Sequence, residues 1–247
     1  MLPKLKKIML SVTLSFIFFS NALFASDQLV VAVGLAKPPY VIQADGSGFE
    51  LDLIRNILKK MGKSTKFVYT QFGHSPKMLA VKEVDAVMTT NQNVFSDSSK
   101  LSDAYITYQN VAISLSDSNL IINTIEDLAN YSIASFQKAD KVLGQAFADA
   151  VDTSPLYMKI ADQSQQPMLL LKKRVEVLIM DRNIFKYFAS ELNIKDINGQ
   201  FTFHQIFPET HYKMAFKNKE YVKIFNNTFA QYKQTDEYLL LRKNYNL

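Results

Sequence analysis

The residues best placed to do chemistry end two segments that repeat one pattern of residue types, 91 residues apart. The first segment runs from Pro76 to Thr90 and the second from Pro167 to Asp181. Each opens with a proline that suits the first turn of a helix, continues with apolar residues at helical spacing, and ends in a Val–acid–apolar run typical of a strand buried on both faces. Ligands of open α/β sheets bind beyond the carboxyl ends of the strands. The repeat therefore predicts two similar lobes that each present a polar strand end to one cleft.

Several polar side chains near the end of the first of these strands are candidate ligand contacts, because they offer both donors and acceptors: Thr89, Thr90, Asn91 and Gln92. Glu50 has two interpretations, since an acid at a helix start either faces the cleft or interacts with the helix dipole. We expect Tyr105 and Tyr108, which lie near the expected hinge, to be structural.

The sequence shows no pattern typical of a catalytic or metal centre. Cysteine is absent, and the three histidines have no spacing that resembles a metal site. No Gly-x-Ser-x-Gly motif occurs. We therefore expect no catalytic residue, no metal and no cofactor; only His74 follows an expected strand end.

The N-terminus predicts a secretory signal. Lys4, Lys6 and Lys7 precede an apolar stretch over 8–19, and Ala25 is the small residue that a signal peptidase needs. We expect residues 1–25 to be cleaved, with an uncleaved anchor as the alternative. The three lysines account for three of the formal +5 charges, which leaves +2, and no basic run interleaved with aromatics predicts a nucleic-acid partner. Without a cysteine for lipid attachment, we expect a protein free in a bacterial periplasm.

The remaining chain alternates strands and helices, which predicts mainly parallel sheets. We place the first lobe at 26–116 and 209–247 and the second at 117–208. The two crossings between them would form a hinge, and hinged lobes can close around a ligand. Besides the two repeated segments, the expected strands are 29–33, 67–69, 105–115, 132–135, 157–161, 201–207 and 212–216, and the expected helices include 51–61, 139–150, 183–192, 219–233 and 236–244.

Several short motifs, in order and spacing, resemble the family 3 extracellular solute-binding proteins. They are Pro39-Tyr40, Gly48-Phe49-Glu50-Leu51-Asp52-Leu53, Val84-Asp85-Ala86-Val87, Leu101-Ser102-Asp103-Ala104-Tyr105, Ile125-Glu126-Asp127-Leu128 and Val175-Glu176-Val177-Leu178-Ile179-Met180-Asp181. The resemblance covers nearly the whole chain after the signal. It implies a two-lobed α/β fold of the type II periplasmic-binding-protein class and a small polar ligand, delivered by a monomer to an inner-membrane ABC permease.

The resemblance also implies site residues. In the family an Asp at the position of Asp181 accepts hydrogen bonds from the ligand's ammonium, although a helix N-cap is an alternative role for it here. Tyr40 lies where the family stacks an aromatic ring on the ligand; packing within the lobe is the alternative.

The sequence departs from the family in two places. Where α-amino-acid binders carry Thr-x-x-Arg, this chain has Gln92-Asn93-Val94-Phe95, and a neutral amide does not replace a guanidinium fork. The Gly-Ser/Thr usual after the second lobe's first strand is replaced by Phe136-Gln137-Lys138-Ala139. Gln137 and Lys138 are therefore candidate ligand contacts, with Lys138 either supplying the missing positive charge or lying on the surface as a solvated lysine.

Two other functions are compatible with the same scaffold. A dehydratase resembling cyclohexadienyl dehydratase would use Glu50 or Asp181 as a general acid. A sensory or adaptor protein would close in the same way but dock on a receptor rather than a permease.

Overall fold

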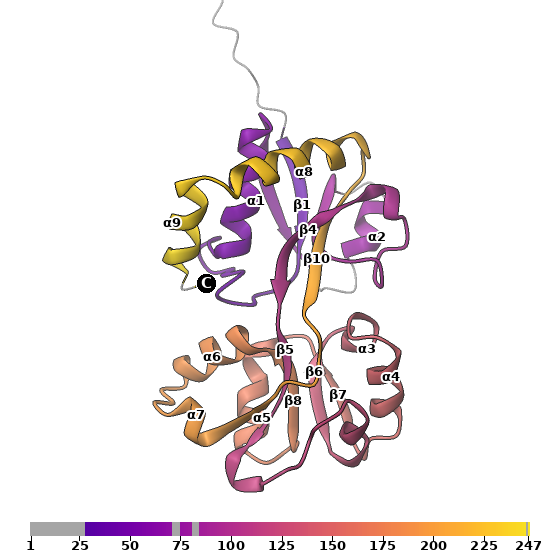
Figure 1. The fold of residues 1–247 in the computed structure, drawn as a ribbon, viewed down its shortest axis with the longest axis vertical. Helices are drawn as coiled ribbons and strands as arrows, with labels where there is room; N and C mark the ends of the chain where they lie inside the picture. The colour runs from indigo at the N-terminus through magenta and orange to yellow at the C-terminus, as the bar shows by residue number, and fades with distance from the viewer. Residues whose placement is uncertain (1–27, 71–74, 81–83, 246) are drawn as a thin grey trace, which may run out of the picture.

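The computed structural model describes residues 28–70, 75–80, 84–245 and 247, which form two lobes stacked along the long axis of the molecule (Figure 1). The predicted signal peptide lies outside the described residues. Within the described part of the chain, none of the helices has the length and apolar character needed to cross a bilayer.

The first lobe contains a five-stranded sheet in the order β2-β1-β3-β10-β4. All of its strands run parallel except β10, which is antiparallel to both of its neighbours. Its elements are β1 (Gln28–Val33), α1 (Phe49–Lys60), β2 (Ser64–Tyr69), α2 (Ser75–Ala80), β3 (Ala86–Thr90), the 3₁₀ turn η1 (Ser98–Lys100), β4 (Leu101–Tyr108), β10 (Thr210–Phe216), α8 (Glu220–Tyr232) and α9 (Asp236–Asn244).

The second lobe repeats this order as β7-β6-β8-β5-β9, with β5 as the antiparallel strand. Its elements are β5 (Asn110–Leu115), η2 (Ser116–Ser118), η3 (Glu126–Asn130), β6 (Ile133–Phe136), α3 (Ala139–Val142), α4 (Gln145–Asp152), β7 (Tyr157–Ile160), η4 (Gln163–Gln165), α5 (Gln166–Leu171), β8 (Val177–Asp181), α6 (Arg182–Glu191), α7 (Ile197–Gln200) and β9 (Phe201–His204). The predicted two-lobed α/β fold, with mainly parallel sheets flanked by helices, is confirmed.

The two repeated segments form the same unit in each lobe. The first gives α2 and β3, and the second gives α5 and β8. Strands β3 and β8 hold the central position of their sheets and are buried along their whole length, as apolar runs without alternation require. Their carboxyl ends both lie toward the junction between the lobes, so the repeat places Thr90 and Asp181 on the facing sides of the two lobes.

The first crossing between the lobes lies earlier in the chain than we predicted from the sequence. The extended segment expected over 105–115 is two strands in different sheets, joined at Gln109. Residues 110–115, which we expected in the first lobe, therefore pair within the second sheet. The return crossing runs through 205–209 beside it, and the Gln109 side chain donates to the Phe207 carbonyl at 3.0 Å. An extended chain has the same residue pattern on both sides of such a crossing, so periodicity alone does not locate it.

One expected helix is also interrupted. The segment 139–150 forms α3 and α4 because Gly144 adopts a φ of 94° between them.

Helix α1 carries the first lobe's part of the site. Its apolar face buries Leu51, Ile54 and Leu58 completely, and each such side chain contributes about 1.5–3 kcal/mol to folding. Gly48 precedes the helix with a φ of 125°, and a Cβ there would lie 2.4 Å from the Tyr40 carbonyl oxygen. The close approach that only glycine allows holds the 34–47 loop against the start of α1.

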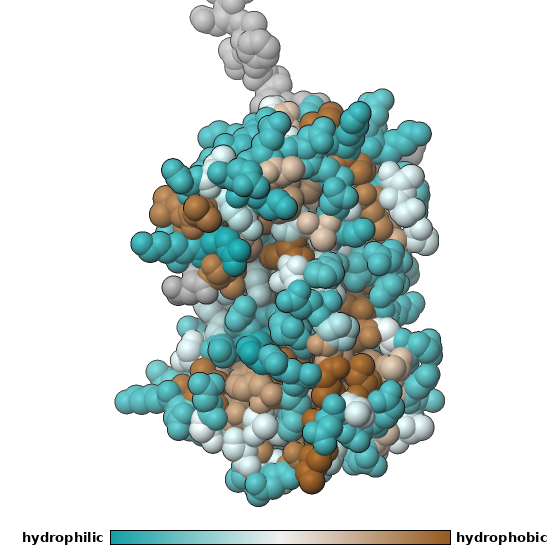
Figure 2. All heavy atoms as spheres, viewed as in Figure 1, coloured by the Kyte–Doolittle hydropathy of each residue, from teal (hydrophilic) through white to brown (hydrophobic). Residues whose placement is uncertain are grey.

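The face of the molecule shown in Figure 2 is mainly hydrophilic, with hydrophobic side chains over α9 and over part of the second lobe. On α9, Leu239 and Leu240 are 61% and 58% exposed.

Candidate functional site

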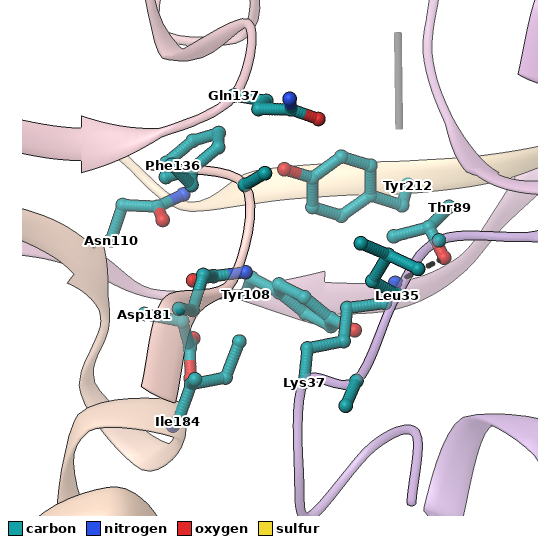
Figure 3. Close-up of a pocket in the computed structure, with 14 residues that line it drawn as sticks. Leu35, Lys37, Thr89, Tyr108, Asn110, Phe136, Gln137, Asp181, Ile184 and Tyr212 are labelled. Atoms are coloured by element: carbon teal, nitrogen blue, oxygen red, sulfur yellow. Dashed lines mark hydrogen bonds between the residues drawn. The ribbon is translucent and has the colours of Figure 1, made fainter. Parts of the chain in front are cut away.

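A pocket between the lobes collects the ends of strands from both sheets (Figure 3). It holds about 580 Å³ of empty space, part of it open to solvent. The first lobe contributes the loop 34–37, Thr89, Tyr108 and Tyr212, and the second lobe contributes Asn110, Phe136, Gln137, Ala161, Gln163, Asp181 and Ile184. A solute in this pocket would contact both lobes at once.

The first-lobe wall contains a buried ion pair. The Lys37 ammonium donates to Glu50 Oε2 at 3.1 Å and to Thr89 Oγ1 at 2.5 Å. Glu50 is fully buried, and it also accepts from the hydroxyls of Thr89 (2.6 Å), Tyr108 (2.7 Å) and Tyr105. Four side-chain donors, one of them cationic, therefore surround this carboxylate within the described structure.

Local structure fixes both members of the pair. Glu50 is the second residue of α1, where the helix dipole favours an acid, and its backbone N–H donates to the Tyr40 carbonyl at 3.0 Å. Lys37 lies in the loop after β1, closed by a 3.0 Å bond from its N–H to the Val41 carbonyl. Burial lowers the pKa of Lys37, against the attraction of Glu50. Burial next to the Glu50 charge raises the pKa of Tyr105 and Tyr108 well above the usual value, so both stay neutral donors.

Asp181 ends β8 on the second-lobe wall and caps α6. Its Oδ1 accepts from the backbone N–H groups of Asn183 (2.8 Å) and Ile184 (3.1 Å), and its Oδ2 accepts from Gln109 (2.9 Å). The side chain is only 2% exposed. Burial raises the pKa of Asp181 to about 6, although these backbone bonds favour the charged form. The N-cap role, one of the two expected from the sequence, is present, and the carboxylate also lines the pocket.

Tyrosines join the two walls. The Tyr40 ring stacks on Tyr108 with centroids 4.1 Å apart, and Tyr108 meets Tyr212 edge-on at 5.0 Å. The Asn183 side chain, at the start of α6, donates to the Tyr40 hydroxyl at 3.0 Å. This hydrogen bond links the first lobe to the second beside the pocket.

The structure brings together three of the eight predicted contact residues: Thr89, Gln137 and Asp181 line the pocket. Tyr40 lies behind Tyr108 and reaches a neighbouring groove. The remaining four lie elsewhere, namely Thr90, Asn91, Gln92 and Lys138.

Each of these four has a local explanation. Thr90 is 1% exposed, and its hydroxyl has no partner among the described residues. Asn91 begins a turn in which its side chain accepts from the Asn93 N–H at 3.0 Å, and with Gln92 it faces a separate groove. Lys138 adopts a φ of 61° before α3, and its side chain is absent from the pocket lining.

Sequence reasoning missed Lys37, Asn110 and Tyr212 and took Tyr108 as structural. Nothing in the sequence around Lys37 marks it as buried. Tyr108 and Tyr212 reach the pocket because their strands are neighbours at the lobe junction, which only the sheet order shows.

No group of three or more potential metal ligands occurs in the part of the chain that the structure describes. His204 forms a hydrogen bond with Ser114 and His211 forms one with Thr107, both at 2.9 Å. His74 lies outside the described residues.

Solved structures share this architecture. The chain is similar to a mutant of ArgBP from T. maritima (TM-score 0.70, 19% identity, covering 88% of this chain and 94% of that one). It is also similar to the ancestral amino-acid-binding protein AncCDT-1, a precursor of cyclohexadienyl dehydratase (TM-score 0.69, 19% identity, 88% and 95% covered). A histidine kinase sensor domain with similarity to periplasmic binding proteins gives a TM-score of 0.73 at 16% identity, with 88% and 95% covered. At these identities the likeness shows the fold.

No curated protein matches the sequence. The family model of bacterial extracellular solute-binding proteins, family 3, matches residues 29–247. With this match over most of its length, and with a two-lobed fold around one shared pocket, the chain belongs to the bacterial extracellular solute-binding proteins of family 3.

Proposed function

We propose that this protein captures a small polar solute between its lobes in the periplasm and delivers it, as a monomer, to an inner-membrane ABC importer. The observation that carries the proposal is the division of the pocket lining between the two sheets. A solute seated there stabilises the closed arrangement of the lobes, and closure is the signal that a membrane partner can recognise.

The geometry gives closure a physical basis. Two adjacent crossings, at Gln109 and at 205–209, connect the lobes. Rotation about two short crossings moves each lobe as a rigid body, because each lobe has its own hydrogen-bonded sheet and the two sheets share no strand. The Tyr40–Asn183 hydrogen bond is then made or broken according to the angle between the lobes.

Thermal unfolding of the chain without residues 1–25, refolded from denaturant to strip bound solute, tests the capture step. A solute present at about 100 times its Kd stabilises the folded state by about 2.7 kcal/mol. We expect at least one small polar compound among amino acids, amines, organic acids and sugars to raise Tm. If no compound in this set raises Tm, the proposal fails.

A sensory role is the second candidate, supported by the likeness to a histidine kinase sensor domain. The closed form would then bind a receptor. Affinity capture on the solute-loaded protein from solubilised membranes separates the two roles, because it would retain permease subunits in one case and a receptor in the other.

An enzymatic role would need a general acid in the pocket, as expected for a dehydratase. Glu50 does not line the pocket and is bound by Lys37 and three hydroxyls, which leaves Asp181 as the candidate acid. Turnover of a prephenate-like acid that disappears in Asp181→Asn would favour this role; stable binding without turnover favours solute capture.

A further inference from the structure

The charge on the first-lobe wall is already balanced. Lys37 lines the pocket, but its ammonium is held 3.1 Å from the buried Glu50 carboxylate. The two side chains are 7% and 0% exposed, so solvent barely screens the pair. No arginine lines the pocket among the residues that the structure describes. The first lobe therefore offers no uncommitted positive charge to a ligand.

The charge on the second-lobe wall is not balanced by a side-chain cation. Asp181 is bonded to backbone N–H groups, and Lys37 acts on it only through space. Arg182, its neighbour in the sequence, turns away to lie over the Phe203 ring at 5.6 Å. Because Glu50 behind the wall balances Lys37, ionised Asp181 gives the pocket and these buried charges together one net negative charge.

The uncharged residues of the pocket lining suit an organic cation. Tyr108, Tyr212 and Phe136 present aromatic rings to the pocket, and Leu35 and Ile184 add apolar surface (Figure 3). Aromatic faces attract cations, and apolar surface accommodates a hydrocarbon body. Asn110 and Gln137 supply neutral polar groups that can bond either donors or acceptors.

We propose that the captured solute is an organic amine, positively charged and lacking a carboxylate, whose ammonium binds Asp181 while its hydrocarbon part lies against Tyr108, Tyr212 and Phe136. This inference rests on the proposed function and specifies its substrate class. A zwitterionic α-amino acid fits less well, because its carboxylate would have to draw Lys37 away from Glu50 and leave that buried acid without its cation.

Matched pairs of compounds test the inference by isothermal titration calorimetry on the refolded protein. Each pair is an amine and the amino acid that differs from it only by a carboxylate: phenethylamine and phenylalanine, histamine and histidine, agmatine and arginine. 3-Phenylpropionate, which has the carboxylate but no amine, completes the first pair. We expect one amine to bind at least about tenfold more tightly than its amino acid, and 3-phenylpropionate not to bind.

The variant Asp181→Asn separates charge from folding, since asparagine is as good an N-cap as aspartate. We expect it to weaken amine binding by about tenfold or more. Asp196→Asn is the matched control, because Asp196 caps α7 through a 2.9 Å bond from the Gly199 N–H on the exposed side of the same lobe. The control should bind the amine as the unmodified protein does.

The other outcomes count against the inference in different ways. An amino acid that binds as tightly as its amine, or amine binding unchanged in Asp181→Asn, overturns the substrate class and leaves solute capture standing. Binding of 3-phenylpropionate alone does the same. If no amine binds at 10 mM the inference falls, and if the amino acids, organic acids and sugars fail as well, solute capture falls with it.

Discussion

Each wall of the pocket holds one buried carboxylate, and the two are satisfied in opposite ways. Glu50 in the first lobe is surrounded by side-chain donors that include the Lys37 ammonium. Asp181 in the second lobe accepts from two backbone N–H groups at the start of α6 and from the Gln109 N–H at the crossing, with the Tyr40 hydroxyl nearby. One carboxylate is part of a closed internal network, and the other keeps a charge that no side-chain cation neutralises. The comparison shows that burial alone does not make an acid structural; the nature of its partners does.

Removing Glu50 should have the largest effect on this comparison. Glu50→Ala leaves the buried Lys37 ammonium without its opposite charge and three hydroxyls without their acceptor, so we expect a loss of about 3–5 kcal/mol in the free energy of unfolding. Urea denaturation measures it. The double variant Lys37→Met/Glu50→Gln removes both charges together and should lose less than the single variant. A Glu50→Ala protein as stable as the original would show that the network contributes nothing.

At Asp181 we expect the opposite effect, because removing its charge should raise the free energy of unfolding. Its pKa is about 6 in the folded state against 3.8 for the free side chain, because burial disfavours the charged form. Between these values the folded protein holds a proton that the unfolded chain has released, so ionisation of Asp181 lowers stability as pH rises through this window. The loss amounts to about 3 kcal/mol at pH 7. Asp181→Asn, which cannot ionise, should be more stable than the original protein at pH 7 by up to that amount, less the bond from the Gln109 N–H that the asparagine NH2 group cannot accept.

The pH series makes this test specific. Lys37, Tyr40 and Tyr212 are the titratable groups that interact with Asp181, and all three are present in both proteins. The advantage of Asp181→Asn over the original protein in unfolding free energy should therefore decrease as the pH is lowered from 7 to 4. A difference that stays constant from pH 4 to 7 would mean that Asp181 titrates normally.

Comparing two substitutions at Asp181 isolates the cap from the charge. Asp181→Ala and Asp181→Asn both lack the charge, but only asparagine still accepts from the first N–H groups of α6. We expect Asp181→Ala to be less stable than Asp181→Asn by about 1–2 kcal/mol at pH 7, measured by denaturant titration. Equal stability of the two variants would contradict the capping role.

The smallest expected effect concerns the contact between the two walls. Tyr40→Phe removes the hydroxyl that accepts from Asn183 across the lobes, and such a bond contributes about 1 kcal/mol. We expect the closed arrangement to lose population by about fivefold and solute affinity to fall accordingly, as seen by small-angle scattering and calorimetry. Tyr131→Phe is the control, because its hydroxyl bonds the Ile121 carbonyl within one lobe. If both variants bind equally well, the Tyr40–Asn183 bond does not hold the lobes together.

Much of the fold could be predicted from the sequence because it follows from local patterns. The repeated helix–strand segments form equivalent units in the two sheets, and Asp181 lies at the end of the second buried strand as expected. An apolar run of strand length and a proline at a helix start carry the same meaning wherever they occur in a chain.

The site could be predicted only in part. Thr89, Gln137 and Asp181 line the pocket, whereas Thr90, Asn91, Gln92 and Lys138 do not. A strand end places several consecutive residues near the cleft, but side chains alternate in direction and turns redirect the chain. The sequence alone therefore indicates which segments lie near the cleft, but not which of their side chains line the pocket.

The amino-acid sequence by itself determined the family, the two similar lobes and the absence of an arginine between Arg55 and Arg174. Only the tertiary structure showed that the one lysine among the described residues that line the pocket is paired with a buried acid. Lys37 meets Glu50 because a loop folds back over the start of α1, and Tyr108 and Tyr212 reach the pocket because two strands distant in sequence become neighbours. Such contacts depend on how whole elements pack. Periodicity and spacing along the chain record the elements but not the charges and rings that packing brings together.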